Sequence, residues 1–322
     1  IRQAKNSYRI AEQFDRQVIT NIIRNVHSAY FNYLKASQLL DVARSNLMSS
    51  QQQLALAEQK YELGSAKKTD LLKAEVRFGQ ARVDVINNDA NLQNAYRTLK
   101  NTMGLVGSDQ DFSAVEVETP LEIVPEFDTG FELIQKFNPS VKAKQYQITS
   151  AELSAKIAKG SRLPTISANA SYSGSAKNLG DAITNSFNDQ KRMNTGVSIS
   201  VPIFSGNSIS TRIQQAKIAV DKQESEYLIQ LQDLSVQLQS MVDQLNNYQE
   251  IIPINETVLI SAEEDLKLAQ VRYTQGSTII LEVLDAQVSV VRARSSLIRS
   301  KYDAYIEQAN LKALLGTLDT NK

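Results

Sequence analysis

The sequence predicts a mainly α protein, in which two structural repeats each form a long antiparallel coiled-coil helical hairpin, with a two-stranded β segment between them. Three observations carry this prediction. The sequence repeats itself at a shift of 212 residues, as from Gly64 to Gly276. Apolar residues recur every seven positions within the repeats, and one stretch between them alternates apolar and polar residues. Only 12 Gly and 6 Pro interrupt the 322 residues, which favours long helices.

The repeat aligns residues 1–104 with residues 213–316 without a gap. The stretch "LALAEQKYELGS" at Leu54 meets "LKLAQVRYTQGS" at Leu266. Identical pairs include Tyr61/Tyr273, Gly64/Gly276, Leu72/Leu284, Arg82/Arg294 and Ile86/Ile298. Self-similarity of this length indicates a tandem duplication. We therefore expect one helical hairpin over residues 1–104 and a second over residues 213–322.

The hairpins follow from a seven-residue apolar period and a glycine turn. The period is clearest at Val283, Val290, Leu297, Ala304 and Leu311, and it predicts left-handed coiled-coil packing. Glycine reaches the left-handed conformation that ends a helix, so Gly64 and Gly276 predict the two turns. Thr69–Asp70 then resembles the start of a returning helix.

Residues 105–160 are expected to form a linker and short helices. Val106–Asp128 is acidic and contains two prolines, which predicts an irregular connection. Gly130–Gly160 predicts two short helices that are separated by a turn at Asn138–Pro139.

Residues 161–212 change to a period of two, which predicts strands at Thr165–Gly174 and Thr195–Phe204 joined by the polar loop Lys177–Asn194. One face of each strand is apolar and the other carries Ser, Thr and Asn. The pattern fits either a soluble hairpin packed on a helix or a pair of transmembrane barrel strands. Because an isolated two-stranded hairpin is barely stable, the strands favour closure of a sheet by oligomerisation.

Composition excludes several classes of function. With 35 basic and 35 acidic residues the net charge is zero, which argues against a nucleic-acid partner. The absence of Cys and the single His leave neither a catalytic constellation nor a metal-ligand set, so we expect no enzyme, no cofactor and no metal site. His27 is interpreted as a packed or surface residue. The sequence contains no run of eighteen apolar residues, so it predicts no transmembrane helix.

Three stretches carry a family resemblance: "LPTISANASYS", "VSISVPIFSG" and "RYTQGSTIILEVLDAQ…LGTL". In this order they resemble the outer-membrane efflux (TolC-like) channel family over essentially the whole chain. The resemblance implies a homotrimer in which each protomer gives four strands to a shared barrel in outer-membrane lipid and long helices to a periplasmic tunnel. It implies an exit duct of a tripartite efflux or type I secretion system in the Gram-negative envelope. The partners would be a periplasmic adaptor (membrane fusion protein) and an inner-membrane transporter.

The chain departs from the family pattern in one respect. The family has a strand pair and a preceding helix in both repeats, whereas here only the second repeat has them. We therefore expect an N-terminal portion, with the first strand pair, to precede Ile1. Without it, we expect the remaining strands to have unpaired edges and to be disordered, mispaired or held by crystal contacts.

The resemblance also assigns site residues. It places Asp70, Tyr273, Glu282 and Asp285 at the pore constriction and gate, where a trimer would gather the acids into a cation-favouring ring. It places Leu63, Gly64, Ser65, Gln275, Gly276 and Ser277 at tips that meet the adaptor. The alternative is that these acids stabilise helix dipoles and that these residues only form turns. Thr278 stands where some members carry an arginine partner of the gate tyrosine.

Two other classes of protein fit part of the pattern. A self-assembling, flagellin-like filament subunit would explain the coiled coils, but not the gap-free duplication with two glycine tips. A periplasmic adaptor also has a helical hairpin, but it has one hairpin flanked by several β-domains.

Overall fold

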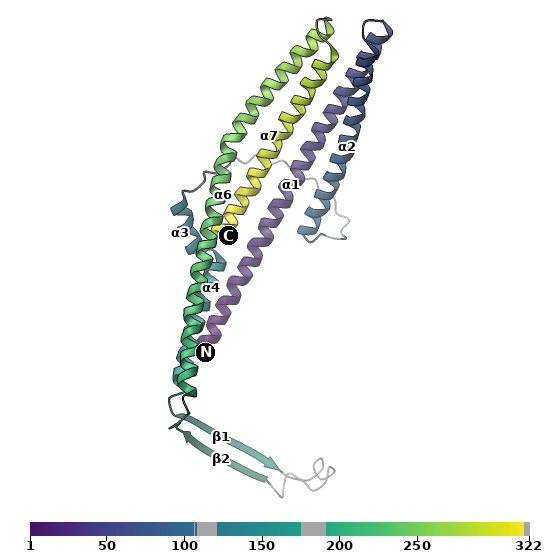
Figure 1. The fold of residues 1–322 in the computed structure, drawn as a ribbon. Helices are drawn as coiled ribbons and strands as arrows, with labels where there is room; N and C mark the ends of the chain where they lie inside the picture. The colour runs from purple at the N-terminus through teal and green to yellow at the C-terminus, as the bar shows by residue number, and fades with distance from the viewer. Residues whose placement is uncertain (106, 108–120, 175–190, 319–322) are drawn as a thin grey trace, which may run out of the picture. The chain divides into compact units, whose positions relative to one another are not determined.

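The computed structural model describes residues 1–105, 107, 121–174 and 191–318. This part of the chain contains six helices and two strands (Figure 1). They are α1 (Arg2–Glu62), α2 (Lys68–Thr102), α3 (Phe127–Phe137), α4 (Pro139–Gly160), β1 (Thr165–Gly174), β2 (Lys191–Ser200), α6 (Ser208–Thr274) and α7 (Ile280–Leu315).

The duplication is visible in the ends of the helices. Hairpin 1 consists of α1 and α2, and hairpin 2 consists of α6 and α7. When hairpin 1 is shifted by the repeat length, the last residue of α1 (Glu62) coincides with the last residue of α6 (Thr274). The first residue of α2 (Lys68) likewise coincides with the first residue of α7 (Ile280). The predicted fold class is confirmed, including both turns.

Glycines end all four helices in the same way. Gly64, Gly104, Gly276 and Gly316 have φ between 70° and 74°, which side chains with a Cβ adopt only at a cost. At each end the glycine N–H bonds back three residues and the next N–H bonds back five, as in Gly64 to Tyr61 and Ser65 to Lys60. This pattern is the Schellman motif.

The seven-residue period marks the buried face of α7. Val283, Val290, Ala304 and Leu311 are buried, and Leu297 is half-buried. The period therefore identifies the buried face of this helix correctly.

The described chain forms two compact units, each discontinuous in sequence. The first contains residues 1–12 and 143–229, with the strands and most of α4. Here α4 holds the start of α1 through Asn6 Nδ2, which donates to the Tyr146 carbonyl at 2.6 Å. It holds the start of α6 through an ion pair of Lys144 with Glu226 at 2.7 Å.

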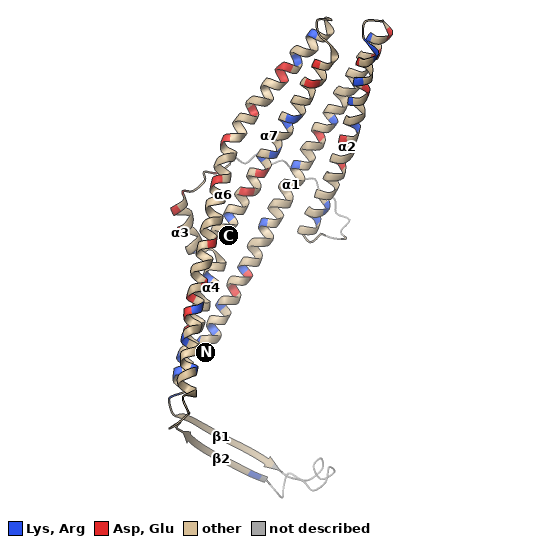
Figure 2. Ribbon diagram, viewed as in Figure 1, with Lys and Arg blue, Asp and Glu red and all other residues tan. Residues whose placement is uncertain are grey.

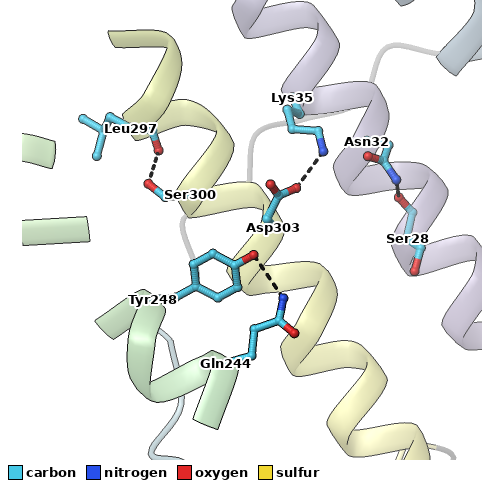
Figure 3. Close-up of polar contacts among 8 residues, drawn as sticks. All are labelled: Ser28, Asn32, Lys35, Gln244, Tyr248, Leu297, Ser300 and Asp303. Carbon is cyan, nitrogen blue, oxygen red and sulfur yellow. Dashed lines mark hydrogen bonds and ion pairs between the residues drawn. The ribbon is translucent and has the colours of Figure 1, made fainter. Parts of the chain in front are cut away.

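The second unit contains residues 13–142 and 230–322, and therefore both hairpin tips. Within it, Lys35 of α1 donates to Asp303 of α7 at 2.7 Å and links the two hairpins (Figure 3). Helix α3 packs on hairpin 2, where Gly130 contacts Leu238. Asn138, between α3 and α4, is buried and donates to the Leu314 carbonyl at the end of α7 at 2.8 Å.

The strands pair antiparallel over ten residue pairs, from Thr165–Ser200 to Gly174–Lys191. Strand β1 has the predicted bounds, but β2 begins and ends four residues earlier than predicted. It ends before Pro202, which cannot donate to a ladder, and its first residues pair with the end of β1. The expectation that the strands are disordered or mispaired is wrong for this pair.

Pairing places the apolar residues of both strands on one face. Ile166 lies opposite Ile199, Ala168 opposite Val197, and Tyr172 opposite Met193. Directly opposed residues share a face of the sheet, so these side chains form one apolar band, which also contains Thr195 opposite Ala170. The band is solvent-exposed, and neither strand pairs with any further strand in the part of the chain that is described.

Charges do not segregate on the helices: basic and acidic residues are interspersed along all four long ones (Figure 2). None of the helices in the described ranges has a segment that is both long and apolar enough to cross a membrane. In the linker, residues 121–126 are irregular as predicted and α3 begins at Phe127. Positions 106 and 108–120 of the predicted connection, and most of the predicted polar loop, lie outside the described residues.

Candidate functional site at the hairpin tips

The two hairpin tips lie side by side in the second unit (Figure 1). A buried cluster joins them: Ala57 of α1, Ala74 of α2, Ala269 and Tyr273 of α6, and Ile280, Val283, Leu284 and Ala286 of α7. All four helices therefore contribute to one small core. Since alanines supply half of it, the helices approach closely and little apolar area holds the tips together.

The turns themselves are exposed. Leu63 is 75% exposed, and its neighbours Gly64 and Ser65 are also exposed. The repeat counterparts Gln275, Gly276 and Ser277 are equally open. In the first turn the Ser65 hydroxyl donates to the Lys60 carbonyl at 2.9 Å, and in the second the Ser277 hydroxyl donates to the Arg272 carbonyl at 3.0 Å. Each of these carbonyls also accepts the backbone N–H of the same serine. The predicted adaptor-contacting residues thus form two equivalent, solvent-facing turns.

Tyr273 is the buried residue of the predicted gate. Burial raises the pKa of Tyr273 above its ordinary value, and the Asp70 carboxylate raises it further, so the phenol stays protonated. The Tyr273 hydroxyl and the Thr278 hydroxyl are buried and have no hydrogen-bond partner among the described residues. A buried hydroxyl without a partner costs about 1–3 kcal/mol, which weakens the packing of the tips.

The side chain of Lys60 contacts Tyr273 from the other hairpin. Its Nζ lies 4.0 Å from the centroid of the Tyr273 ring and donates to the Tyr273 carbonyl at 2.6 Å. The sequence reasoning missed this residue. The repeat alignment contained a signal, because Lys60 aligns with Arg272 and so both tips carry a cation at the same position.

Glu282 and Asp285 are exposed, and each has an arginine partner within the protomer. Glu282 pairs with Arg272 across the turn of hairpin 2 at 3.6 Å. Asp285 pairs with Arg77 of α2 at 3.4 Å. The structure therefore brings all four predicted gate residues to the tips, but it surrounds them with three cations that the prediction did not include.

A second feature lies beside the middle of α1, at the ends of α2 and α7 that are far from the tips. A cavity of about 700 Å³ is lined by His27, Phe31, Met103 and Tyr305, among others, with Lys312 and Glu122 beside them. Lys312 donates to Glu122 at 2.6 Å. Burial lowers the pKa of His27, and the Lys312 charge lowers it further. Among the described residues there is no group of three or more His, Cys, Asp or Glu side chains placed to hold a metal ion.

Comparison with known proteins identifies the family. The sequence profile described as "Outer membrane efflux protein" matches residues 1–105 and 132–317. The outer membrane protein TolC of Vibrio cholerae is 24% identical over 98% of this chain and 71% of its own length. The TolC protein of Escherichia coli is 26% identical over 96% of this chain and 64% of its own length.

The fold has solved counterparts. A membrane protein from Pseudomonas aeruginosa superposes with a TM-score of 0.84, at 22% identity, over 98% of this chain and 72% of that one. These matches confirm the expected channel class and outer-membrane localisation, and they give no support to a filament subunit or a periplasmic adaptor. The chain belongs to the outer membrane efflux protein family.

Proposed function

We propose that the chain is one protomer of a homotrimeric outer-membrane exit duct, which receives substrate from an inner-membrane pump through a periplasmic adaptor. One observation carries the assembly: two apolar residues that are identical in the two repeats are buried in hairpin 2 and exposed in hairpin 1. Leu284 is 2% exposed whereas its counterpart Leu72 is 47% exposed, and Ile298 is 8% exposed whereas Ile86 is 67% exposed.

The contact between the hairpins explains this difference. Ile298 and Tyr302 of α7 pack against Leu34 and Val42 of hairpin 1. Each helix in this contact has a counterpart in the other repeat: α2 for α7, and α6 for α1. The equivalent contact would therefore join α2 of one copy to α6 of the next. Ile86 would then meet Ile254, the counterpart of Val42, which is 59% exposed.

Such a contact is heterologous, because it joins two different surfaces of the chain. A heterologous contact generates a ring when its rotation closes. Three copies would give a ring of six alternating hairpins, which is the arrangement that a helical tunnel requires. The exposed apolar band of the strand pair fits contact with outer-membrane lipid, with the Ser-rich face toward water.

The tips fit the periplasmic entrance of the duct. Glu282 and Asp285 share one face of α7, since residues three apart on a helix are neighbours. In a ring they would line a narrow opening and favour cations. Arg272 and Arg77 offset part of this charge, so the selectivity should be weaker than six unpaired carboxylates would give.

The exposed turns fit the role of adaptor contacts. Leu63 and its counterpart Gln275 project into solvent, so they could meet another protein without rearrangement. Photo-crosslinking residues placed at these two positions should capture the adaptor in cells. The same residue at Glu224, an exposed position of α6 in the first unit, should not capture it.

Oligomeric state tests the assembly. We expect Ile86→Asp and Ile254→Asp each to convert a detergent-solubilised trimer to monomers while the helical content is retained, because each places a charge in an apolar contact. Ile123→Asp, at an exposed position of the linker, is the matched control. Light scattering after size-exclusion chromatography measures the mass. A wild-type protein that is monomeric in mild detergent would contradict the proposal.

Ion conduction tests the entrance. In planar bilayers the intact wild-type trimer should conduct and select for cations. Glu282→Gln/Asp285→Asn should lose most of the selectivity and any block by divalent cations, while Arg77→Gln should increase the selectivity. If neither variant changes the selectivity, these acids serve only the helix termini.

A further inference from the structure

Lys60 makes two contacts with one residue of the opposite hairpin. It lies in the last turn of α1, and its ammonium group both stacks over the Tyr273 ring and donates to the Tyr273 carbonyl. That carbonyl also accepts the Gly276 N–H at 3.2 Å, which closes the turn of hairpin 2. Lys60 therefore binds the capping motif that ends α6.

The electrostatics of this contact are favourable. The last carbonyls of a helix carry a partial negative charge, so a cation is stabilised there. The face of an aromatic ring attracts a cation as well. Neither partner is an ionised side chain, so salt screens this contact less than it screens an exposed ion pair.

The repeat counterpart of Lys60 behaves differently. Arg272 pairs with Glu282 of its own hairpin and does not cross to the other tip in the described structure. Likewise Tyr61, the counterpart of Tyr273, is exposed and has Lys68 of its own hairpin over its ring at 5.3 Å. Only one of the two equivalent cations therefore joins the tips.

A second polar contact between the tips, that of Arg77 with Asp285, is weaker. Arg77 and Asp285 are 42% and 62% exposed, and their closest atoms are 3.4 Å apart. Exposed pairs of this kind contribute little and weaken further in salt. Of these two contacts, the one that Lys60 makes is therefore the more persistent.

We propose that Lys60 is the positioning residue that fastens the tip of hairpin 1 to the tip of hairpin 2 and so holds the entrance closed. This inference rests on the proposed function of the tips as an entrance. It assigns the closing contact within one protomer to a cation whose partners, an aromatic ring and a backbone carbonyl, carry no net charge. Loss of the ammonium group should therefore release the tips at any salt concentration.

The test measures the distance between the tips directly. The 322 residues contain no cysteine, so spin labels can be attached at Leu63→Cys and Gln275→Cys, which are equivalent exposed positions. Labelled protomers are diluted with unlabelled ones in the intact trimer, so that pulsed electron–electron double resonance reports the distance between the two labels within one protomer. The variants are Lys60→Met, Lys60→Arg and the repeat-matched control Arg272→Met.

We expect Lys60→Met to shift the distances to longer values in both low and high salt, Lys60→Arg to restore the wild-type distribution, and Arg272→Met to leave it unchanged. Superimposable distributions for wild type and Lys60→Met would overturn the proposal. So would an equal shift in Arg272→Met, since any lost charge would then suffice.

Bilayer currents of the unlabelled variants separate this proposal from the function on which it rests. Tips that separate in Lys60→Met together with a higher current support both. Tips that separate without any current in wild type or variant would keep the fastening role of Lys60 and reject the channel. Helical content and trimer mass, which should be unchanged in all variants, exclude unfolding as the cause of a shift.

Discussion

The two hairpins of this protein have the same local structure and different surroundings. Their helices begin and end at equivalent residues, and their turns share the same hydrogen bonds. Yet α7 has sixteen buried residues and α2, the equivalent helix, has four. The difference teaches that a duplicated sequence reproduces caps and turns faithfully, while burial depends on which partner each copy meets.

A second difference lies at the end of the hairpins away from the tips. In hairpin 2, α3 covers Leu238, which is fully buried, and Leu315 is buried nearby. The counterparts in hairpin 1, Val26 and Met103, line the open cavity of about 700 Å³. No helix of the described residues covers hairpin 1 in the way that α3 covers hairpin 2.

The largest expected effect contrasts two capping glycines. A Cβ at Gly316 would lie 2.6 Å from the carbonyl carbon and oxygen of Phe137, whereas a Cβ at Gly104 meets nothing within 4 Å. The left-handed backbone costs a non-glycine residue about 1–2 kcal/mol, and a forced backbone shift costs about 1–3 kcal/mol. We expect Gly316→Ala to lower the free energy of unfolding by about 4 kcal/mol and Gly104→Ala by about 1 kcal/mol, as measured by urea titration. Equal losses would show that α3 does not approach hairpin 2 as described.

The next contrast uses two identical isoleucines. Ile298→Ala removes a buried side chain and should cost about 2–4 kcal/mol. Ile86→Ala removes an exposed one and should cost less than about 0.5 kcal/mol in the separated protomer. In the trimer the Ile86→Ala cost should rise toward that of Ile298→Ala, because the assembly would bury Ile86. Thermal melts of trimer and dissociated protomer measure both, and an unchanged cost of Ile86→Ala on assembly would contradict the interface.

A smaller effect is expected at Asn138. Its Oδ1 accepts the N–H groups of Ser140 and Val141 at the start of α4, while its Nδ2 donates to Leu314. Asn138→Ala should cost about 2 kcal/mol, about half from the lost cap and half from the unpaired carbonyl. The exposed Asn101→Ala should be nearly neutral. Comparable urea midpoints for the two variants would show that Asn138 does not tie α3, α4 and α7 together.

The smallest effect concerns pH. The pKa of His27 is lowered by burial and by Lys312, so the unfolded chain binds a proton more readily than the folded one. Stability should therefore fall as the pH drops below the ordinary histidine pKa of about 6.5. His27→Gln, which installs the residue that hairpin 2 has at the equivalent position Gln239, should flatten this dependence. Melting curves between pH 7.5 and 5.5 would show parallel slopes if His27 were not responsible.

Sequence reasoning located what local chemistry determines. The glycine turns, the bounds of β1 and the division at Asn138–Pro139 all follow from the conformational limits of Gly and Pro and from periodicity. The end of β2 was placed too late. The alternating pattern continues to Phe204, but the ladder stops at Ser200, which pairs with the first residue of β1, Thr165. Strand ends depend on pairing, which a single strand does not encode.

The tips show the same limit for the candidate site. The sequence indicated Tyr273 and the acids, but it did not indicate Arg77 as the partner of Asp285 or Lys60 as the partner of Tyr273. Both contacts cross from one hairpin to the other. The register between two hairpins is set by side-chain packing over many turns, so no local pattern reveals which residues face each other.

The capping glycines also restrict how such a protein can change in length. Gly64 and Gly104 lie 40 residues apart, and so do Gly276 and Gly316. One inserted residue would turn every later side chain of a helix by about 100°, and one inserted heptad would keep the faces but move a tip by about 10 Å. A tip displaced in this way would no longer contact the tip of the other hairpin. Insertions and deletions should therefore survive during evolution only as matched changes in all four long helices, which makes hairpin length an inherited property of the pair.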